Sequence, residues 1–333
     1  MKDWSEFPVM SRKCDYCGTV NSGQTFWAHE RMLGTGKKFE LWRCSLCKSV
    51  ILLDPPSDLS QYYPPSYYSF RQKHQGDFLG RKLLVSALSR GLARRANMTM
   101  LSGFLCQSQL VVLAEFVLES RVDREKSSLV DVGSGSGDLL TYASALHFQS
   151  LTGLDAFIPN DILRSDGVAV KRGTLKEVTG EKDLIMFNHS FEHFENPLGT
   201  LREVHRILSP KGLCMIRVPV AGSQASEYYK SDWVQLDVPR HLTIPSERGL
   251  RECARAAGLE LLKVWYDSGP FQFKGSNQNA RRSVESVESE SSRTELKEYG
   301  PKMFDIGYRI MAAKLNNRKA GDQAAFIFRT ANH

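Results

Sequence analysis

Three glycines at alternate positions constrain the fold of this 333-residue chain more than any other feature. The sequence SSLVDVGSGSGDLL places an apolar strand ending at Asp131 before Gly133, Gly135 and Gly137, and the start of a helix at Asp138 after them. Glycines in such a turn let the backbone reverse sharply and approach a ligand closely. The sequence therefore predicts an α/β domain with a doubly wound sheet, whose first strand leads into a ligand-binding loop.

A second acid, Asp155 in LTGLDAF, ends the next predicted strand. A carboxylate at that point can accept hydrogen bonds from both hydroxyls of a ribose. Because NAD, FAD and S-adenosylmethionine are all bound by glycine loops, the loop alone leaves these cofactors open. Dinucleotide sites prefer G-x-G-x-x-G, however, and S-adenosylmethionine has no pyrophosphate to be cradled. The G-x-G-x-G spacing therefore favours S-adenosylmethionine.

The segment EKDLIMFNHSFEHFENPLGTLREVHRILSPKGLCMIRVPV continues the same pattern. It predicts a strand at 183–189, a turn rich in acids and histidine, an amphipathic helix at 197–208 and another strand at 213–218. Strands that alternate with helices in this way are typical of a doubly wound sheet.

Taken together, DVGSGSGD, LTGLD, NHSFEHFENP, SPKGLCMIRVP and WVQLDVPRHLTIPSERGL resemble the motifs of class I S-adenosylmethionine-dependent methyltransferases. The resemblance is to the branch with a Glu-His pair after the fourth strand and a cysteine-rich ribbon in front. It covers roughly residues 125–268, extends more loosely to the N-terminal part and is weak after residue 270. It implies a Rossmann-like methyltransferase sheet, S-adenosylmethionine as cofactor and methyl transfer as the activity.

The resemblance also implies which residues bind the cofactor. Asp155 would hold the ribose, and Asn188 and His189 would line the cofactor floor. The acid that commonly contacts adenine after the third strand is not evident, and Thr174 or a backbone amide is expected to take its place. The residues expected around the methionine part are Asp131, Gly133, Ser134, Gly135 and Gly137.

Two histidines are candidates for a catalytic base. A sulfonium methyl is already activated, so the enzyme mainly holds the nucleophile in line and, for an alcohol or carbon acid, removes a proton. Histidine suits this task because its pKa lies near neutrality. His193, next to Glu192, and His241, next to Arg240, both lie on predicted loops at the carboxyl ends of strands. Alternatively, Glu192 and His193 position the cofactor, and His241 only packs or caps.

Four cysteines form two Cys-x2-Cys pairs, Cys14 with Cys17 and Cys44 with Cys47, separated by 26 residues. Each pair can form a tight turn, and two such turns supply four sulfurs for a structural Zn²⁺. Gly18 favours such a turn because it tolerates a positive φ. Two disulfides or a redox-active pair are the alternatives, and a reducing compartment disfavours structural disulfides. Between the pairs, residues 24–43 predict a β-hairpin.

The formal net charge of +7 is concentrated in one segment, because residues 71–103 alone carry +6. The zinc-ribbon-like part is close to neutral, which disfavours nucleic acid as a partner. The basic segment is instead expected to be solvated or to contact a phosphate of the substrate. In front of it, Tyr62, Tyr63, Tyr67 and Tyr68 in a proline-rich connector would pack the ribbon onto the next domain or line a ligand cleft.

The chain is expected to divide into four parts: a ribbon-like module at 1–53, a connector at 54–76, a basic helical segment at 77–122 and a methyltransferase domain at 123–333. An insertion at about 271–322 would precede the final strand, AAFIFRT. The N-terminus has no apolar run of the roughly 7–15 residues that a signal peptide needs. No stretch predicts a transmembrane span. A cytoplasmic location is therefore expected.

Three functions remain open. The first is methylation of a small molecule, such as a sugar or sugar nucleotide in glycan or secondary-metabolite synthesis, with a possibly phosphorylated acceptor. The second is methylation of RNA or protein, which the near-neutral ribbon disfavours. The third is a non-catalytic partner protein, which the intact glycine loop and Asp155 disfavour.

Overall fold

The computed structural model describes residues 4–64, 67–70, 109–148, 150–164, 167–288 and 302–331. Residues 71–103, which carry the excess positive charge, lie outside the described residues. So does most of the expected helical segment at 77–122, of which the described end is helix α4 (Gln109–Ser120).

The larger sheet has the strand order β12-β13-β10-β9-β5-β6-β8-β7, and its centre is parallel. β13 runs antiparallel to β10 and β12, and β7 runs antiparallel to β8. The order reverses at β5, where a doubly wound sheet places its ligand. Its strands are β5 (Ser128–Val132), β6 (Ser150–Asp155), β7 (Ile162–Leu163), β8 (Ala169–Arg172), β9 (Lys182–Asn188), β10 (Leu208–Pro219), β12 (Leu259–Tyr266) and β13 (Gln323–Thr330). The predicted doubly wound α/β fold is confirmed.

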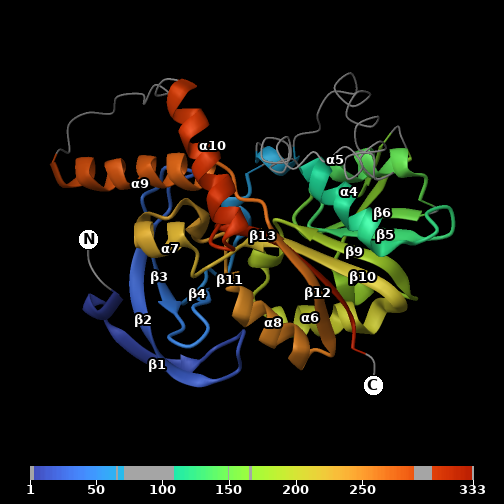
Figure 1. The fold of residues 1–333 in the computed structure, drawn as a ribbon, viewed down its shortest axis with the longest axis horizontal. Helices are drawn as coiled ribbons and strands as arrows, with labels where there is room; N and C mark the ends of the chain where they lie inside the picture. The colour runs from blue at the N-terminus through green and yellow to red at the C-terminus, as the bar shows by residue number, and fades with distance from the viewer. Residues whose placement is uncertain are drawn as a thin grey trace.

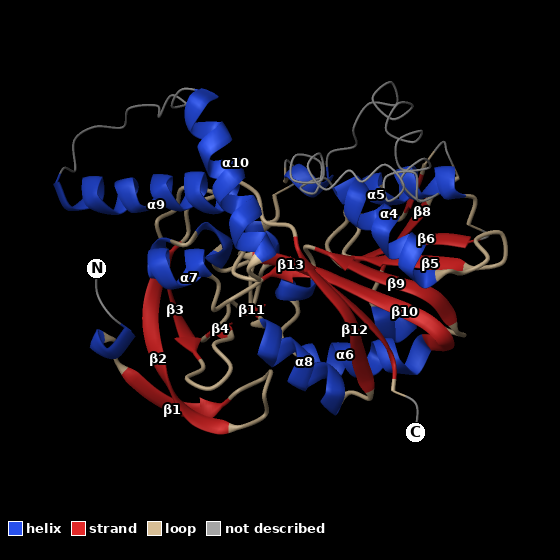
Figure 2. Cartoon of the chain, in the orientation of Figure 1, coloured by secondary structure: helices blue, strands red, loops and turns tan. Residues whose placement is uncertain are grey.

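Helices cover both faces of this sheet (Figure 2). α4 and α5 (Asp138–Ala143) bury their apolar side chains against one face. α6 (Pro197–Ile207) and α8 (Glu247–Ala256) bury theirs against the other. Asn196 caps α6 by accepting a hydrogen bond from Gly199 N at 2.8 Å, which explains why the helix begins there.

The smaller sheet has the order β1-β2-β3-β4-β11, and each strand is antiparallel to its neighbours. The strands are β1 (Val9–Lys13), β2 (Val20–His29), β3 (Lys38–Arg43), β4 (Val50–Leu52) and β11 (Thr243–Ile244). β2 and β3 form the predicted hairpin, and Gly34 and Gly36 in its turn have positive φ. β11 comes from the second half of the chain, so a segment that follows β10 of the larger sheet completes the ribbon sheet.

The ribbon is buried on both sides. One side, with Trp42 and the cysteines, shares an apolar cluster with α8 and with α6. The other side packs against the segment around Trp233 and Leu242, and Tyr62 of the connector joins that cluster. The ribbon therefore packs against the rest of the chain on both of its sides.

The expected insertion contains two helices, α9 (Phe271–Glu288) and α10 (Lys302–Asn317). They lie above α7 (Gln224–Tyr229) on the ribbon side of the molecule (Figure 1). Phe273 of α9 stacks on Tyr308 of α10 with ring centroids 5.3 Å apart. β13 then follows as the predicted final strand. No helix in the described ranges is long and apolar enough to cross a membrane.

Candidate active site

The glycine loop lies between β5 and α5, as predicted. Gly133, Gly135 and Gly137 have φ values of 73°, 54° and 79°, a region that other residues rarely adopt. A Cβ at Gly133 would lie 2.4 Å from Cβ of Ser190, and one at Gly135 would lie 2.5 Å from the carbonyl oxygen of Ser69. The loop therefore needs glycine both for its backbone angles and for its close contacts.

The connector crosses directly over this loop. The carbonyl oxygen of Ser69 accepts a hydrogen bond from Ser136 N at 2.9 Å. Ser69 lies in a short helical turn, η3 (Tyr68–Phe70). Its position over the glycine loop was not predicted. The buried hydroxyl of Ser134 has no hydrogen-bond partner within the described part of the chain, so it is available to a ligand.

Two acids lie beside the loop. Asp155, at the end of β6, accepts hydrogen bonds from Gly135 N and Phe157 N, both at 2.9 Å. Asp131 is buried, and its burial, together with the nearby charge of Asp155, raises its pKa to about 8. A positively charged ligand would therefore be favoured here. The loop, the free Ser134 hydroxyl and the two acids fit S-adenosylmethionine, whose amino and sulfonium groups are cationic.

Asn188 and His189 follow at the end of β9. Asn188 Oδ1 accepts a hydrogen bond from Arg217 Nη1 at 3.1 Å, and Arg217 Nε contacts Asp267 Oδ2 at 2.7 Å. Arg217 and Asp267 are both buried, and their ion pair was not predicted. His189 has a φ of 55°, and its amide donates to the carbonyl of Arg217 at 2.8 Å. Arg217 thus fixes both the side chain of Asn188 and the backbone of His189 at the end of β9.

Glu192, His193 and His241 come together as one group, which we call the His–Glu cluster. One ligand atom of each lies within 4.8 Å of the others. Glu192 is fully buried, and its Oε1 lies 3.7 Å from His241 Nε2 and 3.5 Å from His189 Nδ1. The rings of His193 and His241 are 4.9 Å apart. The structure therefore joins the two histidines that the sequence offered as separate candidates.

The charges in the cluster are set by burial and by mutual contacts. Burial favours the neutral acid at Glu192, but the neighbouring His189, His241 and His193 outweigh it and lower the pKa of Glu192 to about 2. Burial lowers the pKa of His241 below its ordinary value, although Glu192 and Asp237 oppose the shift. At neutral pH the cluster thus combines a carboxylate with a neutral His241.

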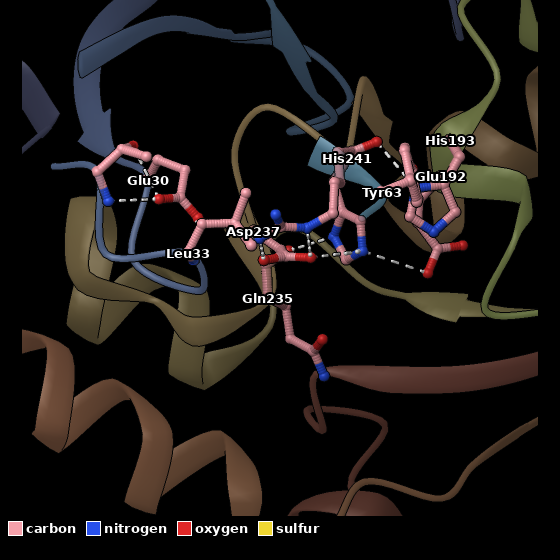
Figure 3. Close-up of polar contacts among 10 residues, drawn as sticks. Glu30, Leu33, Tyr63, Glu192, His193, Gln235, Asp237 and His241 are labelled. Carbon is pink, nitrogen blue, oxygen red and sulfur yellow. Dashed lines mark hydrogen bonds and ion pairs between the residues drawn. The ribbon is translucent and has the colours of Figure 1, made fainter. Parts of the chain in front are cut away.

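Backbone carbonyls fix the orientation of both imidazoles. Nδ1 of His241 donates to the carbonyl of Gln235 at 2.7 Å, and Nδ1 of His193 donates to the carbonyl of Arg240 at 2.8 Å. Figure 3 shows the His241 ring between Asp237 and Glu192. In the neutral form, the lone pair of each ring is therefore on Nε2.

The ribbon contacts this cluster through Arg240. Arg240 is fully buried, its Nε donates to Asp237 Oδ2 at 3.0 Å, and its Nη2 lies 3.6 Å from Glu30 Oε1. Glu30 belongs to the β2–β3 hairpin and accepts hydrogen bonds from Leu33 N at 2.7 Å and Thr35 N at 3.0 Å. Leu33 and Glu30 are drawn with Asp237 in Figure 3. The guanidinium of Arg240 is thus engaged by carboxylates of the protein.

Two of the connector tyrosines pack against different parts of the chain, and a role in lining a ligand cleft stays a prediction. Tyr62 packs edge-on against Phe39 of the ribbon, with centroids 6.1 Å apart. Tyr63 stacks on Phe157 at 4.4 Å, and its hydroxyl lies 3.1 Å from His193 Nδ1. Phe157 lies two residues after Asp155, the acid expected to bind the ribose. It was not among the candidate residues, although an aromatic side chain so close to that acid indicates a place in the site. Tyr63 thus links the cofactor side of the site to the His–Glu cluster.

The expected adenine contact remains a prediction. Thr174 caps a short helical turn, η6 (Leu175–Glu177), and both its amide and its hydroxyl contact Glu177 Oε1, at 3.3 and 3.4 Å.

The four cysteines meet as the spacing predicted. The Sγ atoms of Cys14 and Cys47 are 3.6 Å apart and those of Cys17 and Cys44 are 3.9 Å apart, too far for disulfides. Four sulfurs around one Zn²⁺, each at about 2.3 Å, would lie about 3.8 Å from one another. The donor set therefore fits a tetrahedral zinc ion.

Both cysteine turns close in the same way. Gly18 N donates to the carbonyl of Cys14 at 2.9 Å, and Lys48 N donates to that of Cys44 at 3.0 Å. Gly18 has a φ of 69°, as predicted, and Lys48 has a φ of 71°. Lys48 escaped the sequence analysis, although it occupies the same place after its Cys-x2-Cys pair as Gly18 does.

Comparison with known proteins agrees with the fold. Residues 107–264 match the sequence model of a family described as methyltransferase domain. No curated protein matches the sequence.

Three solved structures illustrate the likeness. The 1,6-didemethyltoxoflavin-N1-methyltransferase of Burkholderia thailandensis is 14% identical, covers 87% of this chain and 99% of its own, and has a TM-score of 0.41. The cyclopropane synthase MmaA2 of Mycobacterium tuberculosis is 15% identical, with 66% and 83% covered and a TM-score of 0.41. The YcgJ protein of Bacillus subtilis is also 15% identical, with 66% and 97% covered and a TM-score of 0.43. These likenesses are too distant to bear on the substrate.

Proposed function

We propose that residues 107–264, which match the methyltransferase family model, form a class I, S-adenosylmethionine-dependent domain that methylates a small-molecule acceptor bound at the His–Glu cluster. The cofactor supplies a methyl group that is already activated as a sulfonium. The chain therefore has to bind the cofactor, place the acceptor atom in line with the methyl carbon and remove the acceptor's proton.

The cofactor side would be formed by the glycine loop and the two acids. The unpartnered hydroxyl of Ser134 and the backbone of Gly133 to Gly137 would contact the methionine part. Asp155 has a free lone pair on each oxygen for the ribose hydroxyls, because each oxygen accepts only one backbone hydrogen bond. The stacked rings of Tyr63 and Phe157 offer an apolar surface beside that ribose site.

The acceptor side would be the His–Glu cluster, and the pairing of His241 with Glu192 is the observation that carries the proposal. His241 is neutral at neutral pH and has its lone pair on Nε2. A proton taken up there would lie close to the Glu192 carboxylate, 3.7 Å away, which would stabilise the imidazolium. His193, held by Arg240 and Tyr63, would orient the acceptor.

Burial of the cluster supports a small acceptor. Glu192 is fully buried and His241 is 7% exposed, so the acceptor atom must enter a narrow site. A sugar or sugar nucleotide with a free hydroxyl or an acidic carbon is the acceptor class that we propose. Cys14, Cys17, Cys44 and Cys47 would hold a structural zinc ion that supports this side.

The test is a thermal-shift assay with S-adenosylhomocysteine, followed by incubation of the cofactor with panels of nucleotide sugars, free sugars and bulk RNA. We expect stabilisation by S-adenosylhomocysteine and a mass increase of one methylene unit on a sugar-containing acceptor. If S-adenosylhomocysteine gives no shift, the chain is a non-catalytic partner. Methylation of RNA with none of the sugars would replace the proposed acceptor class.

A further inference from the structure

The His–Glu cluster has the composition of a metal site. Two ring nitrogens and one carboxylate oxygen lie within 4.8 Å of one another, and the Nε2 of His241 is 3.7 Å from Oε1 of Glu192. Ligands that share one Zn²⁺ at about 2.0–2.2 Å are separated by about 3–4 Å. The three side chains therefore need only small shifts to reach a common ion.

The carboxylate of Glu192 points to a missing partner. Glu192 is fully buried, and neither of its oxygens has a hydrogen-bond partner among the residues that the structure describes. Its polar contacts with His189 and His241 are 3.5 and 3.7 Å long, beyond good hydrogen-bonding distance. Because a buried carboxylate without hydrogen bonds is costly, this arrangement favours a cation beside Glu192.

The ring nitrogens of His193 and His241 are oriented as those of metal-binding histidines usually are. A metal-binding histidine almost always donates its other ring N–H to a carbonyl or carboxylate. Nδ1 of His193 donates to the carbonyl of Arg240 at 2.8 Å, and Nδ1 of His241 donates to that of Gln235 at 2.7 Å. Figure 3 shows His193 and His241 reaching the cluster from different segments, with Glu192 beside them. The lone pairs on Nε2 are thus available for an ion.

We infer that Glu192, His193 and His241 form a second metal site, distinct from the four-cysteine centre, that takes one transition-metal dication such as Zn²⁺ or Co²⁺. Imidazole nitrogens with one carboxylate oxygen suit borderline ions of this class. An ion here uses the lone pair on which the proposed base depends, so metal and proton compete for His241. On the proposed function, loading this site therefore inhibits methyl transfer.

The binding test uses the full chain with its cysteine centre filled by one equivalent of Zn²⁺, to which Co²⁺ is added. We expect one further equivalent, with visible d–d bands and without the thiolate charge-transfer bands of a cysteine site. Glu192→Gln and His241→Ala should each weaken this binding at least about tenfold. His29→Gln, which changes a ribbon histidine outside the cluster, is the control and should bind as before. Stabilisation by S-adenosylhomocysteine shows that each variant is folded.

Two results would overturn the inference. One is the absence of a second equivalent of Co²⁺, and the other is binding that Glu192→Gln leaves unchanged. Measuring methyl transfer in the same samples separates this inference from the proposed function. If Co²⁺ binds at the cluster and transfer continues, the metal site stands and His241 is not the base. If Co²⁺ does not bind and His241→Ala abolishes transfer, the base stands and the metal site does not.

Discussion

On the proposed function, the glycine loop with Asp155 and the His–Glu cluster belong to one site, yet they are assembled over very different distances along the chain. The loop and the acid come from neighbouring strands, β5 and β6, and touch through one hydrogen bond, from Gly135 N to Asp155. The cluster joins Glu192 to His241, which lies in a segment held by the ribbon. The cofactor side is thus built from residues that are close together in the sequence. The acceptor side is built from residues that are far apart in the sequence.

Two successive backbone hydrogen bonds connect the ribbon to the His–Glu cluster. Leu52 N donates to the carbonyl of Leu242 at 2.8 Å, and Leu242 N donates to the carbonyl of Glu192 at 2.8 Å. β11, which follows directly, pairs with β4. The ribbon is therefore bonded directly to the segments that carry Glu192 and His241, which form the proposed acceptor side. Perturbing one side should leave the other largely intact.

Loss of the ribbon metal should have the largest effect. In the double variant Cys14→Ser, Cys44→Ser the four-sulfur centre is destroyed, and a structural zinc ion contributes about 10–16 kcal/mol to folding of its module. We expect methyl transfer to be lost while the affinity for S-adenosylhomocysteine, measured by calorimetry, changes only a few-fold. Equal losses of both would show that the two sides are not separable. Cys214→Ser, at a buried cysteine outside the ribbon, is the control.

His241→Ala should act on the acceptor side alone. Removal of a general base typically costs about 10²–10⁴-fold in rate. We expect kcat to fall by this factor with unchanged affinity for S-adenosylhomocysteine. His205→Gln, on α6, should keep full turnover. Turnover of His241→Ala at the unaltered rate would remove His241 from the mechanism.

Asp155→Ala should act on the cofactor side. Hydrogen bonds to a charged group contribute about 1.5–3 kcal/mol, so S-adenosylhomocysteine should bind about 10- to 150-fold more weakly. The zinc content, measured by elemental analysis, should stay as in the unaltered chain, because Asp155 accepts its hydrogen bonds from Gly135 and Phe157, which lie outside the ribbon. Binding of normal strength would contradict the ribose assignment. Asp161→Ala, at an exposed acid on the same side of the sheet, is the comparison variant.

The last prediction is a pH dependence of the stability of the cofactor-free chain, caused by Asp131. Its pKa is about 8 in the folded chain and near 3.8 when exposed, so the fold favours the protonated acid. Its stabilising contribution is therefore present at low pH and is lost as the pH rises from about 4 through 8, with a slope of up to about 1.4 kcal/mol per pH unit. Thermal unfolding of the cofactor-free chain between pH 5 and 8 measures this slope. Asp131→Asn should flatten it, and parallel curves for the two proteins would refute the assignment.

The sequence predicted the glycine loop and its place beside Asp155 well because these signals are contiguous. Gly133 to Gly137 and Asp155 lie beside the strands that position them, and short apolar runs mark those strands. The cysteine centre was predictable for the same reason, since each pair forms its own turn. The structure confirms the sheet, the hairpin and the final strand.

The acceptor side was predicted only residue by residue. His193 and His241 were both candidates, but nothing local indicated that they share Glu192. The contact of Glu30 with Arg240 and the stack of Tyr63 on Phe157 depend on where the ribbon and connector pack. The roles of Glu192, His193 and His241 in catalysis, and the contacts to the cofactor, stay predictions.

The pairing of β11 with β4 also bears on how the chain reaches this structure. Val50 and Ile51 find their partners, Ile244 and Thr243, only after strands β5 to β10 of the larger sheet have been synthesised. Until then β4 presents an unpaired edge, which is a site for wrong pairing with other chains. Contacts so distant in sequence slow folding. The ribbon is therefore among the last parts of this protein to be finished, although strands β1 to β4 leave the ribosome before the larger sheet.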